Sequence, residues 1–380
     1  MPPIVIDLRQ ADDSRDVVHQ AVQTLAEGRL VVFPTETVYG VGASARSIQG
    51  VEKLFAAKGR SPTAPLALAI KSAEEVLDYV PRPGRMAERL ARRCWPGPVT
   101  LVVDHQTNEG LVSQLPERVR EAIAPNGTLG FRVPAHAIVL DVLRMLTGPI
   151  ALSSANRSGE EAAVTAEQAA ESLGDQVALI LDDGPSRYGQ PSTVVRTTGN
   201  SYSCIRVGVV SPSALDRLAS MIVVLVCTGN TCRSPMAEVM MRKMAAEKLG
   251  CPAAELDQHG VVITSAGIAA AAGCDASSEA VEVMKEKGLD LAKHESQPLT
   301  EKLVRHADVI FTMTSGHCRA ILRRWPEVSS RIHTLRPDGG DIHDPIGGST
   351  VLYHQCAEQI EDALRQRIEE LDFAEEPKTR

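Results

Sequence analysis

The stretch Met221-Ile-Val-Val-Leu-Val-Cys227-Thr-Gly-Asn-Thr-Cys-Arg233-Ser-Pro235 decides the fold of the second half of the chain. Its apolar run from Met221 to Val226 predicts a strand buried on both faces, because such strands lose the alternation of apolar and polar residues. Small and polar residues follow, and Pro235 suits the first turn of a helix, where no N–H is needed. The sequence therefore predicts a buried strand, a tight loop and a helix.

Apolar runs and helical patterns then alternate to the end of the chain. The expected strands cover residues 261–264, 308–313 and 332–335, and the expected helices cover 277–287, 300–306, 316–324 and 350–371. This alternation predicts a doubly wound parallel sheet with helices on both faces.

The first half is also α/β, but its connections differ. Strands are expected at residues 28–33, 100–103, 129–133, 150–152, 178–181, 192–195 and 204–210, and an amphipathic helix at 48–58. Short connections such as 184–191 favour antiparallel returns, so we expect a mixed sheet. A proline among small polar residues at 211–214 indicates a boundary. We predict one domain over residues 1–210, a linker over 211–220 and a second domain over 221–380.

Composition narrows the class of protein. The chain has 380 residues, of which 43% are hydrophobic and 23% charged, as in ordinary soluble proteins. A net charge of −8 argues against a nucleic-acid binder that works by bulk charge, and 3% aromatic residues argue against a base-stacking platform. Eight irregularly spaced cysteines do not form a disulfide framework, and the acidic N-terminal stretch does not form a secretion signal. We expect a cytoplasmic protein without a membrane span.

The loop after Val226 has the residues of an anion site. Backbone N–H groups that converge at a helix N-terminus bind an anion and favour a thiolate at Cys227, which makes this sulfur a nucleophile. Arg233 offers a planar fork for two phosphoryl oxygens, and Ser234 can hydrogen-bond the thiolate. Gly229 and Asn230 suit left-handed backbone. Cys-x5-Arg alone is a weak motif, so the prediction depends on the whole strand, loop and helix.

This loop, together with Met236-Ala-Glu238, Ser265-Ala-Gly267, Ala307-Asp308-Val309 and Asp344-Pro345, resembles the low-molecular-weight protein phosphatase family. The resemblance implies a cofactor-free phosphatase with a phosphocysteine intermediate at Cys227. It gives Asp344 the role of general acid and then general base, while Arg233 binds the phosphoryl group. Support of the loop is expected from Asn230, Thr231, Cys232, Ser234 and His294.

The substrate of this second domain stays open at the level of the sequence. Thr231 stands where phosphotyrosine phosphatases of this family have a bulky apolar residue, so the loop looks more like the protein-arginine phosphatase branch. Ile346 stands where an aromatic residue is usual, which leaves phosphoarginine and phosphotyrosine as alternatives. The related arsenate reductases need a downstream cysteine pair, and only Cys318 stands in the corresponding stretch, so this is the third alternative. Asp341 is interpreted as a solvated loop carboxylate.

The first domain holds no glycine-rich nucleotide loop and no His/Cys cluster with metal spacing. Lys58 and Arg60 follow a predicted helix and could bind phosphates. Hydroxyl residues near strand ends could line a polar pocket: Thr35, Thr100, Ser154 and Ser192. Each of these residues also fits a plainer interpretation, as a solvated charge or a turn residue, so the residues alone indicate only a possible anion pocket.

Several segments together resemble the YrdC-like threonylcarbamoyl-AMP synthases: 33–40, 57–60, 95–100, 129–134, 153–156 and 190–195. The resemblance implies a twisted mixed α/β sheet around a positive cavity. It implies condensation of L-threonine, bicarbonate and ATP, with Mg²⁺ on the triphosphate, to threonylcarbamoyl-adenylate and pyrophosphate. This product serves tRNA modification, which makes the tRNA threonylcarbamoyl-transfer machinery an indirect partner. ATP is expected at Lys58, Arg60, Thr100, Ser154 and Arg206, and threonine at Thr35, Arg132 and Ser192.

Ala64 and Ala69 stand where this family commonly has Asn and His. An alternative is therefore that the first domain is an RNA- or nucleotide-binding module without catalysis, and that only the phosphatase is active. The sequence does not predict the oligomeric state or whether the two domains communicate.

Overall fold

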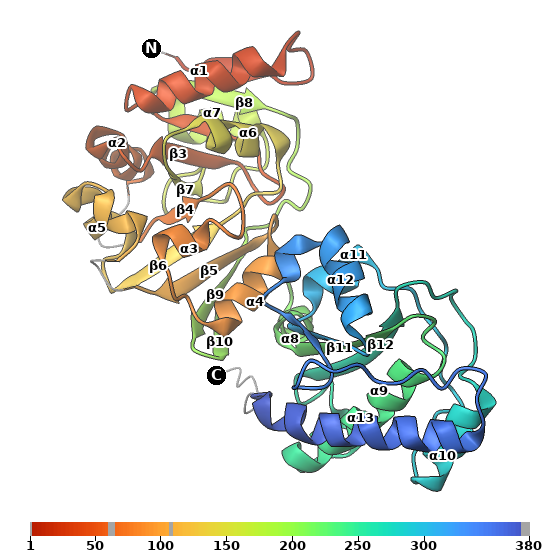
Figure 1. Ribbon diagram of the computed structural model, residues 1–380. Helices are drawn as coiled ribbons and strands as arrows, with labels where there is room; N and C mark the ends of the chain where they lie inside the picture. The colour runs from red at the N-terminus through yellow and green to blue at the C-terminus, as the bar shows by residue number, and fades with distance from the viewer. Residues whose placement is uncertain (1, 60–64, 106–108, 374–380) are drawn as a thin grey trace. The chain divides into compact units, whose positions relative to one another are not determined.

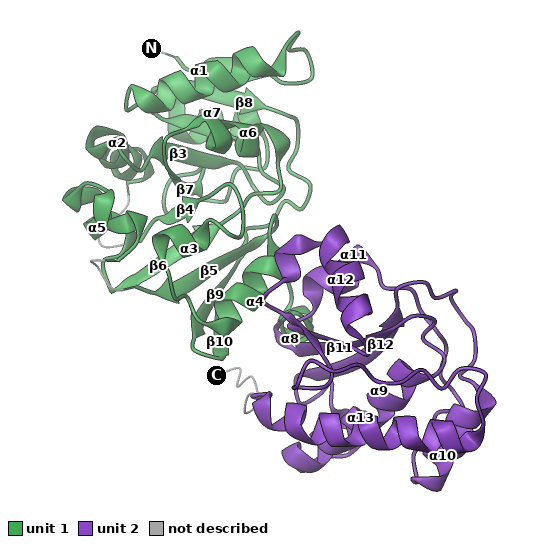
Figure 2. Ribbon diagram, viewed as in Figure 1, with its two compact units in different colours: residues 1–218, 378–380 green, residues 219–377 purple. Residues whose placement is uncertain are grey.

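The computed structural model describes residues 2–59, 65–105 and 109–373. The chain divides into two compact units, one over residues 1–218 and one over residues 219–377, of which the structure describes those up to 373 (Figure 2). The segment expected to be a linker holds helix α8 (Pro212–Ala219), in which Leu215 is fully buried. The domain boundaries at residues 210 and 221 stay a prediction.

Unit 1 is built on a ten-stranded sheet in the order β1-β8-β2-β3-β7-β4-β6-β5-β9-β10 (Figure 1). The strands are β1 (Ile4–Asp7), β2 (Val31–Phe33), β3 (Gly40–Ser44), β4 (Ala67–Ala69), β5 (Val99–Asp104), β6 (Thr128–Arg132), β7 (Ile150–Ser154), β8 (Leu179–Asp182), β9 (Thr193–Thr198) and β10 (Ser201–Arg206). Neighbours pair in parallel at β1/β8, β2/β8, β4/β6 and β5/β9, and antiparallel elsewhere. The predicted mixed sheet is confirmed.

One connection in this sheet was predicted wrongly. Residues 184–191 do not make an antiparallel return, because β8 and β9 lie in different parts of the sheet, and β9 pairs with β5 and β10. The connection is held by a contact distant in sequence, in which Tyr188 N–H donates to the Glu36 carbonyl at 2.9 Å. It therefore passes beside the β2–β3 loop on its way across the sheet.

Helices cover the sheet of unit 1 and bury its central strands. They are α1 (Ser14–Ala26), α2 (Ile48–Lys58), α3 (Val76–Tyr79), α4 (Arg85–Cys94), α5 (Glu117–Ile123), α6 (Ala137–Met145) and α7 (Ala166–Leu173), followed by α8. One core cluster packs Val18 of α1 and Val139 of α6 against Phe33 and Ile150 of the sheet. This packing fixes the ends of β2 and β7, from which two predicted site segments extend.

Unit 2 has a four-stranded, fully parallel sheet in the order β12-β11-β13-β14. Its strands are β11 (Met221–Cys227), β12 (Val261–Gly267), β13 (Val309–Thr312) and β14 (Ile332–Thr334), and its helices are α9 (Arg233–Leu249), α10 (Ser278–Glu286), α11 (Glu301–His306), α12 (Ser315–Arg324) and α13 (Thr350–Glu370). Helices lie on both faces of this sheet (Figure 1). The predicted doubly wound parallel fold is confirmed.

The two faces of β11 belong to different cores, which explains its continuous apolar run. Val223 and Leu225 pack in one cluster with residues of α9, α10 and α13. Val224 and Val226 pack in another cluster with residues of α11 and α12. The carboxyl end of β11 lies between those of β12 and β13, with Cys227 opposite Gly267 and Val226 opposite Thr312. Ligands bind at such an edge in open α/β sheets.

Gly267, the last residue of β12, leaves room for the loop that follows Cys227. A Cβ atom added to it would lie 2.5 Å from the carbonyl oxygen of Thr228 and 3.0 Å from the nitrogen of Asn230. Both neighbours are backbone atoms, so neither can move without shifting the loop.

No helix in the described parts of the chain combines the length and the apolar character needed to cross a membrane.

We predict that Gly267→Ala destabilises unit 2 by about 1–3 kcal/mol, because an added methyl group overpacks the backbone of the loop. Gly316→Ala is the matched control, since an added Cβ there meets no atom closer than 3.5 Å. Calorimetry of the full-length chain measures the effect as a lower unfolding temperature of one transition. Equal unfolding temperatures for the two variants would contradict the close approach.

Candidate active sites

The loop after β11 surrounds the sulfur of Cys227. The Sγ atom lies 3.0 Å from Ser234 Oγ, and the N–H of Asn230 donates to it at 3.2 Å. Cys227 is 3% exposed, while the following residue, Thr228, is exposed. The structure thus brings the predicted nucleophile and its predicted hydroxyl partner together.

Asn230 anchors the loop from within. It is fully buried and has the left-handed backbone expected for it, with φ of 56°. Its Nδ2 donates to Ser234 Oγ at 3.0 Å and to Ser265 Oγ at 2.8 Å, and its Oδ1 accepts the N–H of Gln297 at 2.8 Å. Ser265 Oγ in turn donates to Glu238 Oε2 at 2.6 Å. Gly229, for which left-handed backbone was also expected, does not have a positive φ.

His294 lies where the family resemblance puts it, against Asn230. Its Nε2 donates to the backbone carbonyl of Asn230 at 2.7 Å. The orientation of the loop by this residue stays a prediction, and the geometry is compatible with it.

Arg233 and Asp344 meet at the mouth of the loop. The guanidinium donates to Asp344 Oδ2 through Nη2 and to the carbonyl of Ile342 through Nη1 at 3.3 Å. The Arg233 side chain is 6% exposed and that of Asp344 is 44% exposed. A buried cation and an accessible carboxylate thus lie side by side, an arrangement that suits anion binding and proton transfer at one site.

The remaining loop residues face helices α10 and α13. The Thr231 carbonyl accepts the N–H of Ser277 at 2.9 Å, and Cys232 Sγ lies 3.4 Å from the hydroxyl of Tyr353. Burial, together with the hydrogen bond to Cys232, raises the pKa of Tyr353 to about 12. Cys232 is also the N-cap residue of α9.

His317 was not found by the sequence analysis, although it contacts the loop. It is 6% exposed, and its Nε2 lies 2.9 Å from Thr228 Oγ1 while its Nδ1 lies 3.0 Å from Thr314 Oγ1. Burial, and to a lesser extent the nearby charge of Arg233, lower the pKa of His317 to about 4. No local motif marks this histidine, because it is joined to Thr228 only by the packing of β13 beside β11.

Asp341 is exposed, as expected for a loop carboxylate, but it also has a defined partner. Its Oδ1 accepts the N–H of Ser315, the first residue of α12, at 2.7 Å. The segment that carries Asp344 is thereby tied to the start of this helix.

In unit 1, Lys58 and Ser154 come together as two of the predicted ATP residues. Lys58 is 3% exposed at the end of α2, and its Nζ donates to the Ser154 carbonyl at 2.6 Å and to the Asn156 carbonyl. Ser154 ends β7 and pairs with Gly40 of β3. The ammonium group is therefore fixed by backbone oxygens at the end of a strand.

Thr100, Ser192 and Arg206 form a second group. The hydroxyls of Thr100 and Ser192 lie 2.9 Å apart, and Arg206 Nη2 donates to the Ser192 carbonyl at 2.9 Å. These residues come from β5, from the residue before β9 and from the end of β10, so the strand order brings them together.

Arg132 lies in a buried ion pair that the sequence analysis missed. Its Nη2 donates to Glu36 Oε1 and to Thr37 Oγ1, both at 2.8 Å, and the paired side chains are 9% and 7% exposed. Thr35 joins this group, since its hydroxyl lies 2.9 Å from that of Thr37. Glu36 stands inside the quoted segment 33–40, but a single glutamate there gives no signal of its partner.

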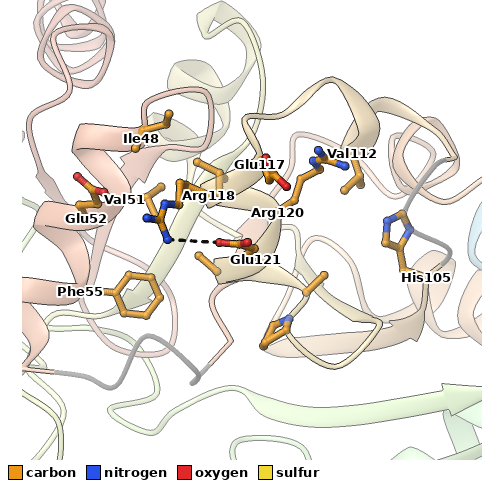
Figure 3. Close-up of a pocket in the computed structure, with 14 residues that line it drawn as sticks. Ile48, Val51, Glu52, Phe55, His105, Val112, Glu117, Arg118, Arg120 and Glu121 are labelled. Carbon is orange, nitrogen blue, oxygen red and sulfur yellow. Dashed lines mark ion pairs between the residues drawn. The ribbon is translucent and has the colours of Figure 1, made fainter.

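Two cavities differ in their relation to these residues. One of about 340 Å³ is lined by Thr35 and Glu36, with residues 96–98, 135–136 and 183–188 around them. A larger one of about 750 Å³ lies between α2 and α5 and includes Phe55 and Arg118 (Figure 3). Because none of the predicted ligand residues within the described ranges lines the larger cavity, whereas Thr35 lines the smaller one, the smaller one is the better candidate site. Arg60 and Ala64 lie outside the described residues, and Ala69 is buried in β4.

Two families match the two parts of the chain. Residues 23–208 match the Sua5/YciO/YrdC family, which has the description "Telomere recombination". Residues 222–376 match the family described as low molecular weight phosphotyrosine protein phosphatase.

Each part of the chain matches similar proteins over most of their own length. A Mycobacterium tuberculosis protein, provisionally named a threonylcarbamoyl-AMP synthase, is 38% identical over 209 residues, which are 55% of this chain and 90% of that protein. A protein-arginine-phosphatase of Bacillus subtilis is 37% identical over 155 residues, which are 40% of this chain and 97% of that protein. A solved structure of a double variant of Pyrococcus abyssi Sua5 is 25% identical, with a TM-score of 0.51, over 87% of this chain and 99% of its own.

The pH dependence of unfolding tests the burial of His317. Its pKa is lowered from 6.5 to about 4, so between these values the unfolded chain takes up a proton that the folded chain does not. The stabilising effect is therefore complete above pH 6.5 and is lost as the pH falls toward 4, by up to about 1.4 kcal/mol per pH unit. Urea denaturation of the full-length chain at pH 7 and pH 5 should show a smaller loss for His317→Gln than for the unmodified chain.

His259→Gln is the control for this experiment. His259 precedes β12 and so lies at the amino ends of the parallel strands, whereas the Cys227 loop lies at their carboxyl ends. It should follow the unmodified chain at both pH values. If His317→Gln also follows it, His317 titrates normally.

Proposed function

Because residues 23–208 belong to the Sua5/YciO/YrdC family and residues 222–376 to the low-molecular-weight phosphatase family, we propose that the chain is a bifunctional enzyme. The N-terminal part is a threonylcarbamoyl-AMP synthase, and the C-terminal part is a cysteine-dependent protein phosphatase. The observation that carries this proposal furthest is the loop that starts at Cys227, in which the Asn230 N–H donates to the sulfur and Arg233, at the end of the loop, pairs with the Asp344 carboxylate. We place the domains at residues 1–210 and 221–380, joined by a linker at 211–220, and the protein in the cytoplasm.

The synthase part condenses L-threonine, bicarbonate and ATP. The threonine amine takes up the carboxyl carbon of bicarbonate with loss of water, and an oxygen of the resulting carbamate attacks the α-phosphorus of ATP, so that pyrophosphate leaves. Such a reaction needs positioning and charge neutralisation more than an activated side chain. Its product supplies the group that modifies a tRNA adenosine, which makes the tRNA-modifying machinery a partner.

Lys58 and Arg60 hold the ATP phosphates in this proposal, with Thr100, Ser154 and Arg206 at the nucleotide. The position of Lys58 supports this role, since its Nζ already lies at the end of β7. ATP enters as its Mg²⁺ complex.

Threonine is held by Thr35, Arg132 and Ser192, with its carboxylate at Arg132. The buried pair of Arg132 and Glu36 supports this assignment, because an amino-acid zwitterion needs both a cation and an anion. Glu36 also accepts the N–H of Ala135 at 3.0 Å, so its carboxylate is fixed as well. The small cavity beside Thr35 and Glu36 offers about 340 Å³ for the substrate.

In the phosphatase part, Cys227 Sγ attacks phosphorus while the loop N–H groups and Arg233 hold the oxygens. Asp344 donates a proton to the leaving group and then takes one from the water that hydrolyses the phosphocysteine. Ser234 stabilises the thiolate, and Asn230, Thr231, Cys232 and His294 keep the loop in shape. No cofactor takes part.

Phosphoarginine in proteins is the substrate that this loop suits best. The Bacillus subtilis relative is named a protein-arginine-phosphatase, and Thr231 offers a hydroxyl where a guanidinium-linked phosphate would enter. Phosphotyrosine is the second candidate, because the matched family is named for it. Ile346, which is 69% exposed after Asp344-Pro345, gives neither substrate an aromatic wall.

For the synthase, we predict that the full-length chain releases pyrophosphate from ATP only when threonine and bicarbonate are both present. Lys58→Ala should lower kcat/KM for ATP by about tenfold to a hundredfold, because a charge-assisted hydrogen bond to phosphate is lost. Lys53→Ala is the matched control on the same helix, since Lys53 Nζ donates to the Gly28 carbonyl at 3.0 Å and not at the site. No pyrophosphate release under any condition would favour the non-catalytic RNA- or nucleotide-binding module, and release without threonine would contradict the condensation reaction.

For the phosphatase, we predict that Thr231→Ile shifts the preference from phosphoarginine toward phosphotyrosine peptides by about tenfold, since an apolar wall leaves a guanidinium without a polar partner. The measurement is the ratio of kcat/KM for two peptides that differ only in the phosphorylated residue. An unchanged ratio means that Thr231 does not select the substrate.

Cys227→Ser sets the baseline, with a loss of at least about a thousandfold for both peptides. Cys251→Ser is the matched control, because Cys251 follows α9 at the far end from the loop. Turnover by Cys227→Ser at the original rate would reject the phosphocysteine mechanism.

A further inference from the structure

The start of helix α12 touches both loops of the phosphatase site. His317, in the first turn, contacts Thr228 of the Cys227 loop, and Ser315 N–H donates to Asp341 in the segment that carries Asp344. The backbone links the same parts, since Met313 N–H donates to the Val226 carbonyl at 2.9 Å. His317 is the side chain by which this helix reaches the nucleophile loop.

The hydroxyl of Thr228 is the atom that His317 can control. Backbone contacts fix the rest of the residue: its carbonyl accepts the N–H of Ala269 at 3.0 Å and lies against Gly267. Thr228 directly follows Cys227 and is exposed. A hydroxyl carries one hydrogen and accepts others, so its partner decides where that hydrogen points.

The hydrogen bonds of Thr314 favour one of the two neutral tautomers of His317. Thr314 Oγ1 caps the helix by accepting the backbone N–H of His317 at 3.1 Å. Its own hydrogen then has Nδ1 of His317 as an acceptor at 3.0 Å. A neutral imidazole that accepts at Nδ1 donates at Nε2, and the group 2.9 Å from Nε2 is Thr228 Oγ1.

The surroundings keep this imidazole neutral. His317 is buried, and the guanidinium of Arg233 acts on it as a like charge, while the two carboxylates of Asp341 and Asp344 only partly offset this effect. In the tautomer that directs Nε2–H at the Thr228 oxygen, the hydrogen of the Thr228 hydroxyl is left for a further acceptor.

We propose that His317 is a positioning residue, which directs the hydroxyl hydrogen of Thr228 toward an oxygen of the phosphoryl group held in the Cys227 loop. The inference rests on the proposed phosphatase function. It adds one donor to those of the backbone and Arg233, and the donor is set by a residue that does not touch the substrate. The opposite tautomer would point the Thr228 hydrogen at Nε2 and would leave the phosphoryl group without it.

Asn and Gln at position 317 separate these two arrangements. An Asn amide can replace Nδ1 at Thr314 but does not reach Thr228, whereas a Gln amide can replace the Nε2 donor. We expect Thr228→Val and His317→Asn each to lower kcat/KM for para-nitrophenyl phosphate by about tenfold to a hundredfold, mainly in kcat. Thr228→Ser and His317→Gln should stay within about threefold of the unmodified full-length chain, because both variants keep the hydrogen bond between positions 228 and 317.

A double variant tests whether the two residues act as one. Thr228→Val with His317→Asn should be no slower than Thr228→Val alone, because the histidine acts only through this hydroxyl. Losses that multiply, or a His317→Gln variant as slow as His317→Asn, would overturn the proposal. Thermal unfolding of each variant is measured beside the kinetics. A purely structural role would lower the unfolding temperature but would not make His317→Asn slower than His317→Gln.

The controls separate this inference from the function on which it rests. His259→Asn makes the same change of side chain at the amino ends of the strands, opposite the Cys227 loop, and should leave kcat and KM unchanged. If the unmodified chain does not hydrolyse para-nitrophenyl phosphate, or Cys227→Ser hydrolyses it at full speed, the phosphatase assignment fails. If those results are as expected but Thr228→Val and His317→Asn have unaltered kinetics, only the role of His317 fails.

Discussion

The buried amide of Asn230 is the contact on which the phosphatase site depends. Its side chain donates to Ser234 and Ser265 and accepts from Gln297, while its backbone donates to Cys227 and accepts from His294. Every polar atom of a fully buried residue is thus satisfied, which is the condition for a polar group inside a core. A loop of small residues needs such an anchor, because it buries little apolar surface of its own.

Unit 1 positions the residues proposed to bind its ligands by a different means. Its mixed sheet brings Thr100, Ser192 and Arg206 together from three strands that are neighbours in space but far apart in sequence. The β2–β3 loop adds Glu36, whose carboxylate fixes Arg132. Such a site is assembled by strand order, whereas the site of unit 2 is largely contained in one loop.

This difference explains how much the sequence could predict. The apolar run 221–226, the left-handed Asn230 and the pairing of Cys227 with Ser234 are local, and the structure agrees with each. The course of residues 184–191 and the partner of His317 depend on which strands lie side by side, which no local pattern contains. Strand β3 was missed because it is rich in glycine, and Gly42 is needed there, since a Cβ would lie 2.5 Å from Ile150.

The way Lys58 is held has a consequence for how the two sites tolerate mutational drift. Two of its acceptors are main-chain carbonyls, of Ser154 and Asn156, and any amino acid at those positions would still supply them. Thr228 and His317, by contrast, meet through side chains alone, so a single codon change removes the contact. Point mutations should therefore erode the fine placement of groups in the phosphatase sooner than the placement of the lysine proposed to bind phosphates in the synthase.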